Sequence, residues 1–329
     1  MSKRRSSPPS SAPAASAPQN GLVVGSHGRH CVVETSDGSR RICHPRGKKS
    51  QAVVGDRVLW QQPPAGQGEE GTIEKVLDRR NLLYRRDEIR TKMFAANIDQ
   101  VLILIAAEPV FSESQLARAL IAAEDAGIQP IIALNKSDLE EPFFDAWMRL
   151  SAYRAIQNAD GSDHYPVIPL NLTSDDPDQR EALMDLFEGK STLVLGPSGS
   201  GKSTLINLLV PGASAATNEI SQALNSGKHT TTTTTWYWMD EERSTALIDS
   251  PGFQEFGLYH IAPTDLPRCM PDIGAKAEEC KFYNCTHLHE PGCAVMAEVE
   301  NEGSPHCIDA NRYRIYSELF DELSQSPWR

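Results

Sequence analysis

A glycine-rich stretch at residues 191–209 limits what this chain can fold into more than any other feature. The apolar run STLVLG is typical of a buried strand, TLINLL is typical of a helix, and the pattern G-x-x-x-x-G-K-S lies between them. Its glycines let the backbone turn so that successive N–H groups face a phosphate at the helix N-terminus. The stretch predicts an α/β domain with a phosphate-binding loop formed by Gly196, Pro197, Ser198, Gly199, Ser200, Gly201, Lys202, Ser203 and Thr204.

Two side chains of this loop and one later motif predict how a triphosphate and its metal are held. We expect Lys202 to bridge the β- and γ-phosphates and the Ser203 hydroxyl to bind Mg²⁺. The strand TALID ends in Asp249-Ser250-Pro251-Gly252, which has the form D-x-x-G. Asp249 would hold Mg²⁺ through a water molecule, and the N–H of Gly252 would contact the γ-phosphate.

The tetrapeptide Asn135-Lys136-Ser137-Asp138 follows the strand-like run PIIAL and predicts which base is bound. A carboxylate at Asp138 can accept hydrogen bonds from guanine N1–H and from its 2-amino group, whereas adenine has no such pair of donors. Asn135 would hold the loop and the base edge, and the stem of Lys136 would pack on the ring. GTP and GDP are therefore the expected ligands, and this motif conflicts with the alternative of a P-loop ATPase or kinase.

A threonine-rich segment lies between the phosphate loop and D-x-x-G. Gly227-Lys228-His229 is followed by threonines 230–235, of which Thr231 is the candidate for completing the Mg²⁺ shell when γ-phosphate is present. Many GTPases have a glutamine after D-x-x-G that orients the attacking water, but this chain has Phe253. We expect slow intrinsic hydrolysis, with His229 as the candidate that positions the water; an exposed loop histidine without that role is the alternative.

The order of these motifs differs from that of common small GTPases, in which the guanine motif comes last. Here the N-K-x-D motif precedes the phosphate loop. Such an order arises by circular permutation, in which the original termini, lying close together, are joined and the chain is opened at another position. The chain is therefore expected to contain a circularly permuted P-loop GTPase domain.

The region before this domain has short strand-like runs separated by Gly, Asp-Gly and Pro-Pro turns. Four or five such strands predict a small OB-like β-barrel that binds RNA, and an SH3-like barrel would give nearly the same pattern. Residues 1–90 hold 16 basic and 9 acidic residues, a net charge of +7, whereas the whole chain carries −12. A basic front end can bind a phosphate backbone locally, although a solvated basic surface is the alternative.

Cysteines concentrate near the C-terminus in the pattern Cys280-x₄-Cys285-x-His287-x₅-Cys293. Three thiolates and an imidazole suit a tetrahedral Zn²⁺, and four protein ligands leave no open position, so we expect one structural zinc. Reduced core cysteines are the alternative, and His289 competes as a ligand. Cys269 and Cys307 are expected to be ordinary small residues.

These observations predict a multidomain α/β fold with a C-terminal helical zinc-binding domain. The expected divisions are a disordered tail at 1–20, an OB-fold RNA-binding domain at 21–90, the permuted GTPase domain at 91–262 and the zinc-binding domain at 263–329. No apolar run is as long as a membrane helix, and no apolar stretch follows the N-terminal basic residues as it would in a signal peptide. A cytoplasmic protein without membrane contact is expected.

The motifs NKSD, GPSGSGKST, GKHTTT, DSPGF and the cysteine cluster, in this order, resemble the YjeQ-type family of circularly permuted, ribosome-associated GTPases. The resemblance covers roughly residues 21–325. It implies binding to the small (30S) ribosomal subunit and its rRNA, and hydrolysis of GTP to GDP and phosphate that the subunit stimulates during late maturation. It also supports the role suggested for His229. The fifth guanine-binding element usually reads Ser-Ala, whereas this chain has Asn171-Leu172-Thr173, which puts base contacts from that loop in doubt.

We therefore expect a ribosome-dependent GTP hydrolase that acts as a monomer. The alternative is a protein without enzymatic activity: an RNA-binding scaffold made of the barrel and the zinc domain, with a vestigial nucleotide site. Intact Lys202, Ser203, Asp249 and Asp138 favour the enzyme.

Overall fold

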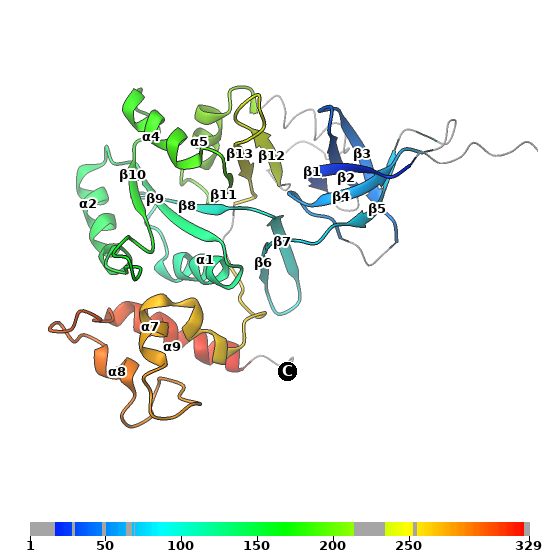
Figure 1. Ribbon diagram of the computed structural model, residues 1–329. Helices are drawn as coiled ribbons and strands as arrows, with labels where there is room; N and C mark the ends of the chain where they lie inside the picture. The colour runs from blue at the N-terminus through cyan, green and yellow to red at the C-terminus, as the bar shows by residue number, and fades with distance from the viewer. Residues whose placement is uncertain are drawn as a thin grey trace, which may run out of the picture.

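The computed structural model describes residues 17–27, 30–47, 51–63, 68, 70–213, 234–252 and 255–325. The chain forms a small barrel, a central α/β layer and a C-terminal helical region, in this order along the sequence (Figure 1). The multidomain α/β fold expected from the sequence is confirmed. The expected domain boundaries stay predictions. A two-stranded hairpin spans the boundary expected at residue 90.

The N-terminal barrel closes on itself through five strands. Their order is β1-β2-β3-β5-β4, and β4 pairs back with β1. Because β3 and β5 run parallel, the connections are those of an OB-like barrel rather than of an SH3-like one. Val23, Val33, Trp60 and Ile73 fill the interior. The strands are β1 (Gln19–His27), β2 (His30–Thr35), β3 (Arg40–Pro45), β4 (Arg57–Gln61) and β5 (Gly71–Val76).

The central sheet is parallel except for one strand. Its order is β10-β9-β8-β11-β13-β12, and β12 runs antiparallel to β13. β8 is buried along its whole length, as its continuous apolar sequence requires of a central strand. The strands are β8 (Gln100–Ala106), β9 (Gln129–Asn135), β10 (Val167–Leu170), β11 (Ser191–Leu195), β12 (Thr235–Trp238) and β13 (Ala246–Asp249).

Two helices of this layer, α1 and α4, begin at residues whose side chains cap them. The Ser112 side chain accepts a hydrogen bond from Gln115 N and starts α1, and Asp176 caps α4 in the same way with Pro177 following it. Seven apolar residues of α1 are buried, because the helix packs on the sheet and is covered by the C-terminal region on another side. The helices are α1 (Glu113–Asp125), α2 (Glu140–Arg149), α3 (Ser151–Arg154), α4 (Pro177–Phe187) and α5 (Lys202–Leu209).

A separate hairpin, β6 (Leu82–Arg86) and β7 (Thr91–Ala96), connects the barrel to the central sheet. Ala96 N donates to Val54 O of the barrel at 2.9 Å, and Asn97 Nδ2 donates to Gly55 O at 2.9 Å. The sheets of barrel and central layer also meet, because Gly25 of β1 pairs with Thr235 of β12. β6 also packs against α1, so the hairpin is attached to both parts.

The C-terminal region packs beneath α1 (Figure 1). It consists of η1 (Pro263–Asp265), η2 (Pro267–Cys269), α7 (Pro271–Ala277), α8 (Ala294–Glu298) and α9 (Ala310–Ser324). One face of α9 is apolar and buried, with Ile315, Tyr316, Leu319 and Leu323 in the interior. Among the described residues, no helix combines the length and the apolar composition that crossing a membrane requires.

A buried ion pair between α7 and α9 lies where this region contacts the central layer. Arg312 of α9 is 2% exposed, and its Nη2 donates to Asp272 Oδ1 at 2.6 Å. The guanidinium also lies 4.7 Å from the ring centroid of Tyr153 in α3. The charge of Arg312 is thus compensated at the contact between the two regions.

Replacing Asp272 by Asn should leave the Arg312 charge buried without its partner. Because loss of one member of a buried pair costs about 3–5 kcal/mol, we expect D272N to lower the free energy of unfolding by about that amount. Urea unfolding measures the difference. The exposed pair Arg314–Glu318 provides the control, since E318Q should cost less than about 1 kcal/mol. Equal effects of the two substitutions would contradict the prediction.

Candidate nucleotide-binding site and metal-ligand cluster

The phosphate loop follows β11 and leads directly into α5. Gly199 and Gly201 have φ of +83° and +102°, a region that favours glycine. A Cβ on Gly196 would lie 2.6 Å from Leu104 O, so the loop passes too close to β8 for a larger residue. The loop therefore has the conformation that its glycines predict, with its backbone at the N-terminus of α5.

Asn135 connects this loop to two other segments. The side chain is buried at the end of β9, and its Nδ2 donates to Ser200 O at 2.9 Å. Its Oδ1 accepts from Leu172 N at 3.1 Å. A Cβ on Gly201 would lie 2.3 Å from Asn135 Nδ2, which explains glycine there. The first residue of the guanine motif thus fixes the phosphate loop against residues 171–173.

The rest of the guanine motif lies in a turn held by backbone and side-chain contacts. Lys136 has φ of +69°, and its Nζ donates to Glu108 O at 2.5 Å. Ser137 N donates to Leu170 O at 3.0 Å. Asp138 is exposed, and its side chain has no hydrogen-bond or ion-pair partner among the described residues. Its carboxylate is therefore available to a ligand.

One cavity of about 1270 Å³ brings the guanine motif and the phosphate loop together. Asn135, Lys136 and Asp138 line it on one side, with the loop 171–173 beside them. The phosphate-loop residues that line it are Pro197, Ser198, Gly199, Gly201, Lys202, Ser203 and Thr204. Ser137, Gly196 and Ser200 belong to the same loops without lining the cavity. Segments more than 60 residues apart thus share a space large enough for a nucleotide.

Lys202 and Asp249 form an ion pair at the phosphate end of this cavity. Lys202 Nζ lies 2.6 Å from Asp249 Oδ1, and both side chains are about nine-tenths buried. Burial raises the pKa of Asp249, and the Lys202 ammonium opposes that rise. Ser203 is exposed at the first turn of α5, and Gly252 lines the cavity beside the phosphate loop. The four residues expected around the triphosphate are thus close together.

The threonine-rich segment enters this site at its C-terminal end. Thr234 is buried, and Thr235 is the register partner of Asp249 between β12 and β13. The expected catalytic candidates His229 and Thr231 lie outside the described residues, as does Phe253. Their roles stay predictions.

The cavity also contains residues that the sequence motifs do not indicate. Arg85 of β6, Lys92 of β7 and Glu255 line it together with the phosphate loop. No motif surrounds Arg85 and Lys92, and both lie close to the expected domain boundary. The only signal in the sequence was the cluster of basic residues near position 85.

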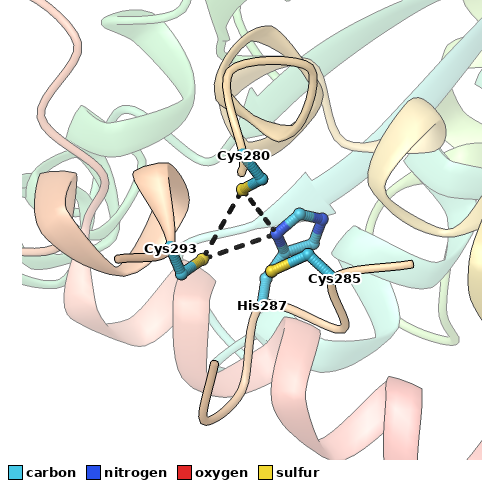
Figure 2. A group of neighbouring side chains, drawn as sticks. All are labelled: Cys280, Cys285, His287 and Cys293. Atoms are coloured by element: carbon cyan, nitrogen blue, oxygen red, sulfur yellow. Dashed lines mark hydrogen bonds between the residues drawn. The ribbon is translucent and has the colours of Figure 1, made fainter. Parts of the chain in front are cut away.

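The four residues expected to bind zinc come together in the C-terminal region. Figure 2 shows Cys280, Cys285, His287 and Cys293 converging, and their ligand atoms all lie within 4.8 Å of one another. Cys280 Sγ is 3.8 Å from Cys293 Sγ and 3.4 Å from His287 Nδ1. A tetrahedral zinc with ordinary bond lengths separates its ligands by about 3.5–3.8 Å, so the cluster fits one. Cys269, Cys307 and His289 lie outside it.

Neighbouring side chains hold the loop of this cluster. Tyr313 OH donates to His287 O at 2.7 Å, and Tyr316 OH donates to Thr286 O at 2.8 Å, both from α9. Burial acts to raise the pKa of Glu290, but hydrogen bonds from Thr286 hold it well below its ordinary value. Burial lowers the pKa of His287, which favours the neutral imidazole that binds metals.

A guanine motif that precedes the phosphate loop, with both lining one cavity, defines a circularly permuted GTPase. The family model described as RsgA GTPase matches residues 76–259. The small ribosomal subunit biogenesis GTPase RsgA of Variovorax paradoxus (strain S110) is 68% identical over 307 residues, which are 93% of this chain and 93% of that protein. The protein of the same name from Burkholderia pseudomallei (strain K96243) is 49% identical over 93% of this chain and 92% of its own length.

Solved structures show the same likeness over nearly the whole chain. The crystal structure of YjeQ from Thermotoga maritima has a TM-score of 0.69 and 29% identity, and covers 94% of this chain and 99% of that one. The structure of YloQ, a circularly permuted GTPase, has a TM-score of 0.66 and 27% identity, over 95% and 97%. The chain belongs to the RsgA GTPase family, and it is a GTP hydrolase.

Proposed function

We propose that this GTPase binds the small (30S) ribosomal subunit and its rRNA and hydrolyses GTP to GDP and phosphate during late maturation of the subunit. The single observation that carries this proposal is the shared cavity of guanine motif and phosphate loop in a chain with an OB-like barrel. The names of its curated relatives, which refer to biogenesis of the small ribosomal subunit, support it. The protein acts as a monomer in the cytoplasm.

In this proposal the nucleotide lies along the cavity with its base at Asp138. The carboxylate accepts from guanine N1–H and the 2-amino group, and the backbone of residues 196–204 surrounds the phosphates. Lys202 leaves Asp249 when phosphate oxygens replace that carboxylate as its partner. Ser203 and the freed Asp249, the latter through water, would hold Mg²⁺, which would supply positive charge beside the phosphates. The Ser203 hydroxyl would supply an oxygen ligand directly, and Asp249 would accept a hydrogen bond from a water bound to the cation.

Hydrolysis requires a positioned water and an ordered threonine loop. Thr231 completes the metal shell when the γ-phosphate is present, and His229 orients the attacking water. The pairing of Thr235 with Asp249 supports this proposal, because Thr235 follows both residues closely in the chain. Zn²⁺ has a structural role at the cluster of three cysteines and one histidine, whose donor distances fit tetrahedral coordination.

The barrel supplies a basic surface for rRNA. Arg40 and Arg41 of β3 are both exposed. Arg40 forms an ion pair with Glu34 of β2, with 3.1 Å between Nε and Oε2. Arg41 has no carboxylate within 4.0 Å among the described residues. Its guanidinium is therefore available to a phosphate backbone, as RNA binding requires.

A GTP hydrolysis assay with and without purified small subunits tests the proposal. We expect subunits to stimulate kcat of the wild-type protein, and R41E to need a higher subunit concentration for the same stimulation. The cause is loss of a phosphate contact, so the dependence of subunit binding on salt should also weaken by about one unit of slope. Hydrolysis without subunits should not change in R41E.

The matched control is R180E, a charge reversal at an exposed position of α4 in the central layer. It should behave as the wild type does. Equal weakening by R41E and R180E would show a nonspecific effect of charge and contradict the role of the barrel. Subunit binding without any GTP hydrolysis would instead favour the RNA-binding scaffold with a vestigial nucleotide site.

A further inference from the structure

Two cationic side chains enter the nucleotide cavity from the β6–β7 hairpin rather than from any GTPase motif. Arg85 and Lys92 line the same cavity as Ser198, Lys202 and Gly252. The Arg85 side chain is 21% exposed, and its Nε is buried with no hydrogen-bond partner in the part of the chain that the structure describes. A buried guanidinium N–H without an acceptor is costly, so a missing partner is expected at this position.

The two charges also face each other. Arg85 and Lys92 are register partners across the hairpin, where like charges directly opposite are destabilising. Burial lowers the pKa of Lys92, and Arg85 lowers it further. The nearest carboxylate to Arg85 is Asp87 at 3.9 Å, and Lys92 has none within 4.0 Å among the described residues. Two clustered cations with so little compensation suit an anionic ligand.

The hairpin approaches the cavity from the side of D-x-x-G. Arg86 N donates to Gly257 O at 3.0 Å, and Tyr259 N donates to Arg86 O at 3.0 Å. The backbone next to Arg85 is thus bonded to the segment that follows Gly252. Because Gly252 and Ser198 lie at the phosphate end and Asp138 at the base end, Arg85 is placed near the terminal phosphate.

We infer that Arg85 contacts the γ-phosphate of GTP and stabilises its transfer to water, and that Lys92 adds positive charge beside it. In this reaction the water oxygen bonds to the γ-phosphorus while the bond from phosphorus to the β–γ bridging oxygen breaks. The water gives up a proton to an oxygen of the released phosphate or to solvent, and GDP leaves with the bonding electron pair. A guanidinium at this point neutralises charge on the transferring group, as arginines supplied in cis or in trans do in other GTPases. The inference rests on the proposed position of the triphosphate.

The test compares R85A, R85Q and R85K with R86A, a control on the same strand whose side chain does not line the cavity. Affinities for GDP and for a non-hydrolysable GTP analogue, and kcat without subunits, are measured for each. Since such an arginine contributes about 10³- to 10⁵-fold in GTPases that use one, we expect R85A and R85Q to lower kcat at least about tenfold. They should bind the GTP analogue more weakly and GDP as the wild type does, and R85K should recover part of both losses.

Three outcomes would overturn the inference: unchanged kcat in R85A and R85Q, equal loss of GDP and GTP-analogue affinity, or the same loss in R86A. Circular dichroism identifies a variant that does not fold, in which case R85K against wild type decides between the outcomes. Subunit stimulation measured on the wild type in the same assay tests the proposed function separately. If subunits do not stimulate hydrolysis by the wild type, the proposed function is rejected. The effect of R85A on kcat without subunits still tests the role of Arg85.

Discussion

Asp138→Asn should change the nucleotide that this protein uses from GTP to xanthosine triphosphate. A carboxylate accepts two hydrogen bonds from guanine N1–H and the 2-amino group, whereas an amide offers one acceptor and one donor. Xanthine has a donor at N1 and a carbonyl in place of the 2-amino group, which matches the amide. Sites built on such hydrogen bonds discriminate by up to 10⁴- to 10⁵-fold, so we expect a loss of at least about 10³-fold in kcat/KM for GTP.

The measurement is kcat/KM for GTP, ATP and xanthosine triphosphate in the wild type and D138N. D145N is the matched control, because Asp145 is exposed on α2 and does not line the cavity. It should leave the order of preference unchanged. Selectivity for GTP that survives in D138N would place the base elsewhere, and the shared cavity would then not be the guanine site.

Local signals account for most of what the sequence predicted correctly. Ser112 begins α1 because its hydroxyl accepts a hydrogen bond within the first turn, and this depends on a few consecutive residues. The phosphate loop is equally local, since Gly199 and Gly201 supply the positive φ angles that its turn requires. These elements follow from the sequence because their causes lie within a few residues of them.

Contacts between distant segments were beyond such reasoning. The closure of the barrel depends on β3 beside β5, which no periodicity indicates. The charges of Arg85 and Lys92 look like those of any exposed hairpin until the fold brings them to the phosphate loop. His287 and His289 were both plausible ligands by spacing. In the structure His287, whose φ is +62°, has its Nδ1 3.4 Å from Cys280 Sγ, whereas His289 lies outside the cluster.

The metal cluster gives the second large expected effect, and Cys293→Ser tests it. Cys293 Sγ lies 3.5 Å from His287 Nδ1, and its side chain also caps α8 by accepting from Met296 N. Structural zinc contributes on the order of 10 kcal/mol to the folding of small metal-dependent domains, because the site does not exist in the unfolded chain. We expect the wild type to contain one zinc per chain and C293S to contain none.

Loss of the metal should release the loop between α7 and α8 while the central layer stays folded. The reason is that four ligands of this segment converge on one point and two hydroxyls of α9 hold its backbone, whereas one face of the sheet has an apolar core that this segment does not enter. Limited proteolysis should therefore cut C293S within this loop, and nucleotide affinity should change little. C307S and H289A are the controls, since both side chains are exposed outside the cluster and should leave zinc content at one per chain. A C293S protein that has the zinc content of the wild type and resists cleavage would show that Cys293 is not a zinc ligand. Loss of zinc in H289A would show that His289 binds the metal in place of His287.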